Sequence, residues 1–111
     1  MKKRFLLVIS LICTNSAIAD SVVDMCSKSD KICACAASQL KEDVGADDYT
    51  LYEAIGADYI ANQAKGMDRG SAWDAAVKVE ATKRGSTSTK ILSKTNSIGR
   101  AHNKAIKSCS K

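Results

Sequence analysis

The segment TKILSKTNSIGRAHNKAIKSC, residues 89–109, decides the fold of this chain. A helix turns by 100° per residue, so eight side chains of this segment, most of them apolar, fall within one arc of roughly 140°. The arc holds Ile91, Leu92, Thr95, Ile98, His102, Ala105, Ile106 and Cys109. Basic residues are predicted on the opposite side: Lys90, Lys94, Arg100, Lys104, Lys107 and Lys111. The pattern predicts an amphipathic helix that buries one side and exposes a basic one.

The rest of the chain also has helical periodicity. It contains no proline, and no stretch alternates polar and apolar residues for long, so helices are favoured over strands. We predict three further helices, over residues 21–44 with a break at 27–30, over 47–65, and over 71–84. Predicted helix starts are Ser29 or Asp30, Asp47, Ser71, and Thr87 or Ser88, with glycines 45, 66 and 85 as stops. The predicted fold class is all-α, a small four-helix bundle-like domain.

The N-terminal segment has the features of a secretory signal peptide. A basic start at residues 2–4 precedes an apolar run at 5–12, and Ala17-Ile18-Ala19 forms an A-x-A cleavage site. The apolar run is too short for a spanning helix, which needs roughly 20 apolar residues. We therefore expect a signal peptide over residues 1–19, cleavage before Asp20, and a single mature domain over residues 20–111 in the periplasm or secreted.

Four cysteines lie in the expected mature domain: Cys26, Cys33, Cys35 and Cys109. An even number in a small exported domain predicts two disulfides. A bond between Cys33 and Cys35 is disfavoured because helical residues two apart do not face each other. One of these two cysteines should therefore pair with Cys26 and the other with Cys109, and both assignments remain open. The bridge to Cys109 closes a loop of roughly 75 residues, which the chain-entropy model values at about 3–4 kcal/mol.

The charges of the chain are unevenly distributed along its length. The full chain has a net charge of +5, and removal of the signal peptide leaves +2. Residues 20–74 carry 11 acidic and 5 basic side chains, whereas residues 75–111 carry 1 acidic and 9 basic ones. A weak net charge and export argue against nucleic acid as a partner. The basic segment either packs beside the acidic one as a solvated face or meets an anionic partner.

Candidate catalytic chemistry is sparse. Cys33-Ala34-Cys35 is a C-x-C pair that can shuttle a disulfide or bind a soft metal, but structural disulfides explain it better in an oxidising compartment. His102 is the single histidine, and a hydrogen-bonded core histidine is the interpretation we favour. No catalytic, metal-binding or phosphate-loop motif is present in the sequence. We expect neither an enzyme nor a metal or cofactor site.

Binding is therefore the function that the sequence favours. Candidate partner-binding residues are Trp73, Lys90, Lys94, Lys104 and Lys111. The expected partner is another envelope protein, as for an accessory factor of a secretion or conjugation system or for an inhibitor. An anionic membrane surface is a further candidate partner. Two alternatives are a periplasmic chaperone of the acid-protective type and a toxic or antibacterial effector that acts on membranes through the basic helix.

Overall fold

The structure, a computed structural model, describes residues 20–111. Within this range five helices and no strands are present. They are α2 (Ser21–Met25), α3 (Asp30–Val44), α4 (Ala46–Ala64), α5 (Arg69–Lys83) and α6 (Ser88–Cys109). The predicted all-α class is confirmed, with the first expected segment divided into α2 and α3. The predicted signal peptide lies outside the described residues.

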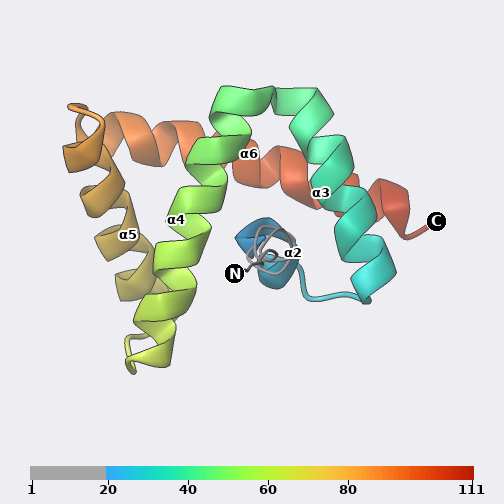
Figure 1. Ribbon diagram of the computed structural model, residues 1–111, viewed down its shortest axis with the longest axis horizontal. Coiled ribbons are helices and arrows are strands. Elements are labelled where there is room, and N and C mark those ends of the chain that lie inside the picture. The colour runs from blue at the N-terminus through green and yellow to red at the C-terminus, as the bar shows by residue number, and fades with distance from the viewer. Residues whose placement is uncertain (1–19) are drawn as a thin grey trace, which may run out of the picture.

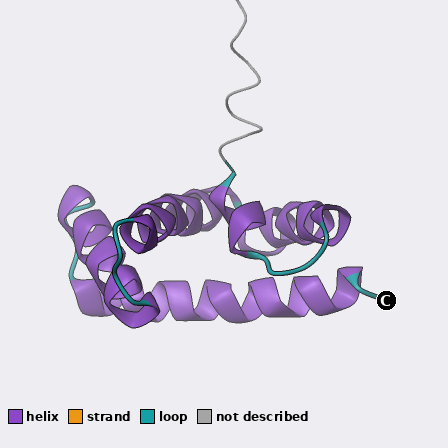
Figure 2. Ribbon diagram, turned by 90° about the horizontal axis from the view of Figure 1, so that it is seen from below, coloured by secondary structure: helices purple, strands orange, loops and turns teal. Residues whose placement is uncertain are grey.

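The helices form two layers (Figures 1 and 2). Helices α3 and α4 form a hairpin, and short α2 lies in the V between them. Helix α5 lies beside α4, and the long α6 runs across the other helices as a layer of its own. Helix α6 packs most extensively on α3, and α5 on α4. One complete side of α6 therefore faces away from the other helices.

Helix starts follow local capping, and two of the predicted starts are confirmed. The side chain of Ser29 accepts a hydrogen bond from the backbone N–H of Ile32 at the start of α3. The side chain of Thr87 does the same for Lys90 at the start of α6. Each cap satisfies one of the backbone donors that a helix leaves free in its first turn.

Two other predicted starts are wrong. Helix α4 begins at Ala46 rather than at an Asp47 cap, because Gly45, with φ of 90°, turns the chain directly from α3 into α4. Asp47 instead lies in the first turn, where its charge complements the helix dipole. Helix α5 is capped by Asp68 rather than Ser71, and Ser71 donates both its backbone N–H and its hydroxyl to the Asp68 carboxylate.

Two groups of buried side chains form the core. The first joins α2, α3, α4 and α6 and consists of Val22, Ala37, Leu40, Tyr49, Tyr52 and Ile98. The second joins α4, α5 and α6 and consists of Leu51, Ile55, Ala76, Val77, Ala81 and Ile91. Trp73 packs against both groups and connects them.

Gly56 marks a close approach of α2 to α4. A Cβ atom at this position would lie 3.0 Å from Oγ of Ser21 and closer still to the end of the Met25 side chain. The same contact is reinforced by the hydroxyl of Ser21, which donates a hydrogen bond to the backbone carbonyl of Glu53. The short helix α2 is thereby fixed to the middle of α4.

Candidate partner-binding surface

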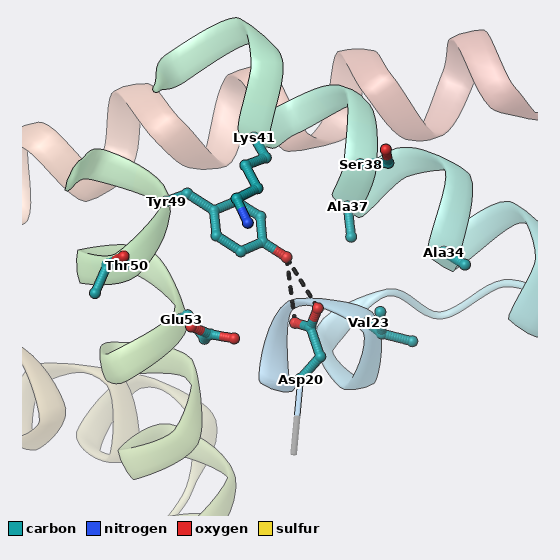
Figure 3. A pocket seen from close by; sticks show the side chains of 9 residues that line it. All are labelled: Asp20, Val23, Ala34, Ala37, Ser38, Lys41, Tyr49, Thr50 and Glu53. Atoms are coloured by element: carbon teal, nitrogen blue, oxygen red, sulfur yellow. Dashed lines mark hydrogen bonds between the residues drawn. The ribbon is translucent and has the colours of Figure 1, made fainter. Parts of the chain in front are cut away.

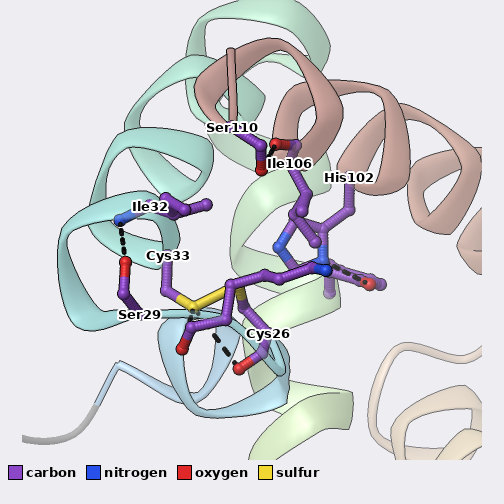
Figure 4. The surroundings of a disulfide bond; sticks show 9 residues. Cys26, Ser29, Ile32, Cys33, His102, Ile106 and Ser110 are labelled. Carbon is purple, nitrogen blue, oxygen red and sulfur yellow. Dashed lines mark hydrogen bonds between the residues drawn. A yellow bond between two sulfur atoms is a disulfide. The ribbon is translucent and has the colours of Figure 1, made fainter.

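The two disulfides connect both ends of the fold to α3. Cys26 pairs with Cys33 and Cys35 with Cys109, with Cα atoms 5.6 Å and 6.0 Å apart. This pairing resolves the two alternatives that the sequence left open. The first disulfide closes the turn between α2 and α3 and lies beside α6 (Figure 4). The second ties the last residue of α6 to α3, so the C-terminal half of α6 is held at a fixed position.

The outward side of α6 carries a basic stripe, which we define as Arg100, Lys104, Lys107 and Lys111. Arg100, Lys104 and Lys107 are spaced by four and three positions, so they lie above one another on one side of α6, and Lys111 follows two residues after the helix ends at Cys109. All four are exposed. The ion pairs found among residues 20–111 involve other side chains. Helix α6 itself contains no acidic residue, so the stripe is a surface of uncompensated positive charge.

Two of the predicted partner-binding lysines lie elsewhere on α6. Nζ of Lys94 is 3.3 Å from Oδ1 of Asp48, so its charge is engaged with α4. Lys90 and Lys94 also line a surface hollow together with Asp47 and Asp48. The prediction that both lysines lie opposite the apolar arc is wrong for Lys94, which at 100° per residue falls next to that arc. Both lysines remain exposed, but the first turn of α4 places two carboxylates beside them, so they face a local acidic group.

Trp73 lies inside an aromatic cluster and is only partly exposed. Its ring meets those of Tyr52 and Tyr59 edge to face, with centroids 6.2 Å and 5.2 Å apart. Such contacts stabilise the fold beyond the area they bury. The structure thus gives Trp73 a packing role between α4 and α5, and it stands apart from the basic stripe, which is on α6.

His102 is a core residue of α6. It is 3% exposed, and its Nδ1 lies 3.0 Å from the hydroxyl of Tyr52, with which it shares a hydrogen bond. Its Nε2 has no hydrogen-bond partner among the described residues. Burial lowers the pKa of His102 below its ordinary value of 6.5, against a smaller opposing effect of the Asp20 carboxylate. Burial also raises the pKa of Tyr52 to about 12. Both side chains are therefore neutral near pH 7.

Protonation of His102 should destabilise the fold in mild acid. The folded-state pKa lies below the unfolded value of 6.5, so the unfolded chain binds more protons as the pH falls past that value. The stabilisation is present above pH 6.5 and is lost below it. We predict that the free energy of unfolding, measured by urea denaturation, falls between about pH 7.5 and about pH 5.5, and that His102→Gln reduces this pH dependence.

The difference in unfolding free energy between the parent and His102→Gln separates the effect of His102 from that of other titrating groups. Burial raises the pKa values of Glu53 and Asp58, and these carboxyls act in the opposite direction, adding stability as they become protonated. They are present in both proteins, so they cancel in the difference. Parallel stability curves for the parent and His102→Gln would contradict the assigned role of the histidine.

A second polar group surrounds Asp20, the expected first residue of the mature chain (Figure 3). The hydroxyl of Tyr49 donates to the Asp20 carboxylate at 3.0 Å, and Nζ of Lys41 lies 5.6 Å from the centroid of the Tyr49 ring. Burial and the Asp20 charge raise the pKa of Tyr49 far above its ordinary value of 10.0. The hydroxyl therefore stays protonated as a fixed donor, and the contact anchors the start of α2 to α4 rather than supplying a reactive group.

Within residues 20–111, no helix is long and apolar enough to cross a membrane. In the same range, no group of three or more His, Cys, Asp or Glu side chains is arranged to hold a metal ion. Comparisons with models of protein families, with curated proteins and with solved structures found no match. The function must therefore be inferred from the residues of the chain itself.

Two members of the basic stripe, Arg100 and Lys107, were absent from the candidate residues chosen from the sequence. The signal that would have found them is the spacing of Arg100, Lys104 and Lys107, which places these three within a narrow part of the α6 surface. Of the lysines chosen from the sequence, Lys104 and Lys111 belong to this stripe.

Proposed function

We propose that this chain is a small exported protein that acts by binding another envelope protein and does not act as an enzyme. The observation that carries the proposal is the basic stripe on the outward side of α6. Three of its four exposed charges lie on a helix held by a disulfide at its end, and Lys111 follows two residues after that helix ends. Surface charge that serves no contact within the fold favours association with an acidic surface, because it steers encounter and fixes orientation.

Two features support export as part of the proposal. Two disulfides are typical of proteins that fold in an oxidising compartment. The predicted signal peptide ends directly before Asp20, and Asp20 is the N-cap of α2. Cleavage at the predicted site would therefore leave every described helix intact. The location we propose is the periplasm or the exterior of the cell.

The two alternative functions receive less support. A membrane-active helix needs apolar residues on the side that meets lipid, but the large apolar side chains of α6 face the protein core and its outward side is polar. A chaperone that holds unfolded proteins needs exposed apolar surface. Among the described residues, Met67 and Val79 are the most exposed large apolar side chains, and they are only 36% and 45% exposed.

Affinity capture from the cell envelope tests the proposal. We expect the parent protein to retain an envelope protein, and the variant Arg100→Glu/Lys104→Glu/Lys111→Glu to lose it. All three substitutions are at exposed positions, where effects on stability are usually below about 0.5 kcal/mol each, so the helical circular dichroism spectrum should persist. Mass spectrometry of this chain, recovered from the cell envelope, should give Asp20 as its first residue.

A matched control has the same change in charge at other places. Lys31, Lys65 and Lys78 are exposed, lie outside α6 and take part in no ion pair found among residues 20–111. Their replacement by glutamate should leave capture unchanged. Equal loss in both triple variants would show that only net charge matters and would contradict a specific surface on α6.

A further inference from the structure

A second basic feature lies where the turn between α2 and α3 meets the start of α5 and the end of α6. A surface hollow of about 470 Å³ is present there. Its lining includes three cationic side chains, Lys28, Arg69 and Lys107, from three separate parts of the chain. It also includes the hydrogen-bonding side chains of Ser27 and Asn103.

Each segment that carries a cation is held by a contact already described. Lys28 is in the turn closed by the disulfide between Cys26 and Cys33, and its carbonyl oxygen lies 3.5 Å from Sγ of Cys33. Arg69 is the first residue of α5, directly after its Asp68 cap. Lys107 is two residues before Cys109, which is bonded to α3. The backbone that presents the three charges is therefore fixed before any ligand arrives.

The positive charge of this hollow is not neutralised locally. No carboxylate lines it among the residues that the structure describes. None of its three cations takes part in the ion pairs found within residues 20–111. Asp68 directly precedes Arg69, but its carboxylate accepts hydrogen bonds from Ser71 and does not line the hollow. Asp24 borders an adjoining hollow that shares Arg69. Three like charges that share one hollow repel each other, and an anion would relieve that repulsion.

We propose that this hollow binds a phosphate group. A phosphate monoester has three strong acceptor oxygens and a net charge of roughly −1.5 to −2 at pH 7. It therefore matches three cations better than a single carboxylate does. The planar guanidinium of Arg69 suits two phosphate oxygens at once, while the two lysines act as point charges. Ser27 and Asn103 supply neutral donors. The phosphate comes either from a free phosphate compound or from a lipid headgroup.

The test is a titration of the disulfide-bonded protein with inorganic phosphate, followed by two-dimensional NMR at constant ionic strength. We expect saturable shifts of backbone amides in the turn that carries Ser27 and Lys28, at Arg69 and near Asn103. The variant Lys28→Gln/Lys107→Gln should bind phosphate about tenfold more weakly or worse, since each lost charge-assisted contact contributes to the affinity. Shifts that do not saturate, or that saturate elsewhere, would overturn the proposal.

Lys78→Gln is the matched control, because Lys78 is exposed on α5, the helix that carries Arg69, but does not line the hollow. Its affinity for phosphate should equal that of the parent, and an equal loss would indicate a general charge effect and overturn the site. Vesicles that contain phosphatidic acid, compared with phosphatidylcholine alone, distinguish the sources. If the protein binds the phosphatidic acid vesicles and inorganic phosphate displaces it, the phosphate group belongs to a lipid headgroup. If the protein binds inorganic phosphate but not the vesicles, the phosphate group belongs to a free compound. Lys107 belongs to both the basic stripe and this hollow, but the capture variant leaves Lys107 unchanged, so either proposal can fail alone.

Discussion

Removal of the disulfide between Cys35 and Cys109 should lower the free energy of unfolding by about 2–5 kcal/mol, the usual range for a native disulfide in a small secreted domain. The two cysteines are 74 positions apart, whereas Cys26 and Cys33 are 7 apart. In the chain-entropy model the longer loop restricts the unfolded chain more. The bond also ties α6 to α3, so its loss frees the end of the helix that carries the basic stripe.

The suitable variant replaces both cysteines by serine, because a single replacement would leave a free thiol. Cys35 is exposed and Cys109 partly exposed, so the serines themselves should cost little. Urea denaturation followed by circular dichroism gives the free energy of unfolding for each protein. Equal transition midpoints for the parent and the double variant would show that this disulfide is dispensable for stability.

Leu40→Ala should destabilise the protein by a similar amount, about 2–5 kcal/mol. Leu40 is 0% exposed and belongs to the first core group, where α2, α3, α4 and α6 meet. Truncation removes buried methyl groups and leaves a cavity that rigid neighbours cannot fill completely. For a domain whose total stability is expected to be about 5–15 kcal/mol, this is a large fraction. The same denaturation experiment measures it.

Val79→Ala is the control for core truncation. Val79 is 45% exposed on α5, so its truncation should change the free energy of unfolding by less than about 0.5 kcal/mol. If Leu40→Ala were no more destabilising than Val79→Ala, the first core group would not be the centre of the fold.

The fold was predictable because apolar residues recur at helical spacing over most of the chain. The buried residues of α6, from Ile91 to Ala105, all belong to the arc expected from the sequence. The starts of α4 and α5 were less predictable, because several residues near each start are able to cap a helix. At Gly45 a turn with positive φ connects two helices without a side-chain cap, and at Asp68 the true cap precedes the expected one by three residues.

The site was predictable only in part. The spacing within α6 identifies its basic side and places Lys94 next to the apolar arc. That Lys94 meets Asp48 depends on how α4 crosses α6, which a single sequence does not specify. Residues 28, 69 and 107 share no sequence motif, and only the folded chain brings them to one hollow. The pairing of Cys35 with Cys109 likewise depends on which side of α3 faces the end of α6. Long-range arrangements of this kind follow from helix packing and not from local pattern.

The most direct test of binding through α6 is the affinity for the captured partner at two salt concentrations, about 0.05 M and about 0.5 M, which differ several-fold in charge screening. We predict that the parent binds more tightly at low salt and that Arg100→Glu/Lys104→Glu/Lys111→Glu loses this low-salt affinity, while the control with Lys31, Lys65 and Lys78 replaced keeps it. Identical low-salt affinities for the parent and the α6 variant would contradict the proposal, because the basic stripe would then be only a solvated surface.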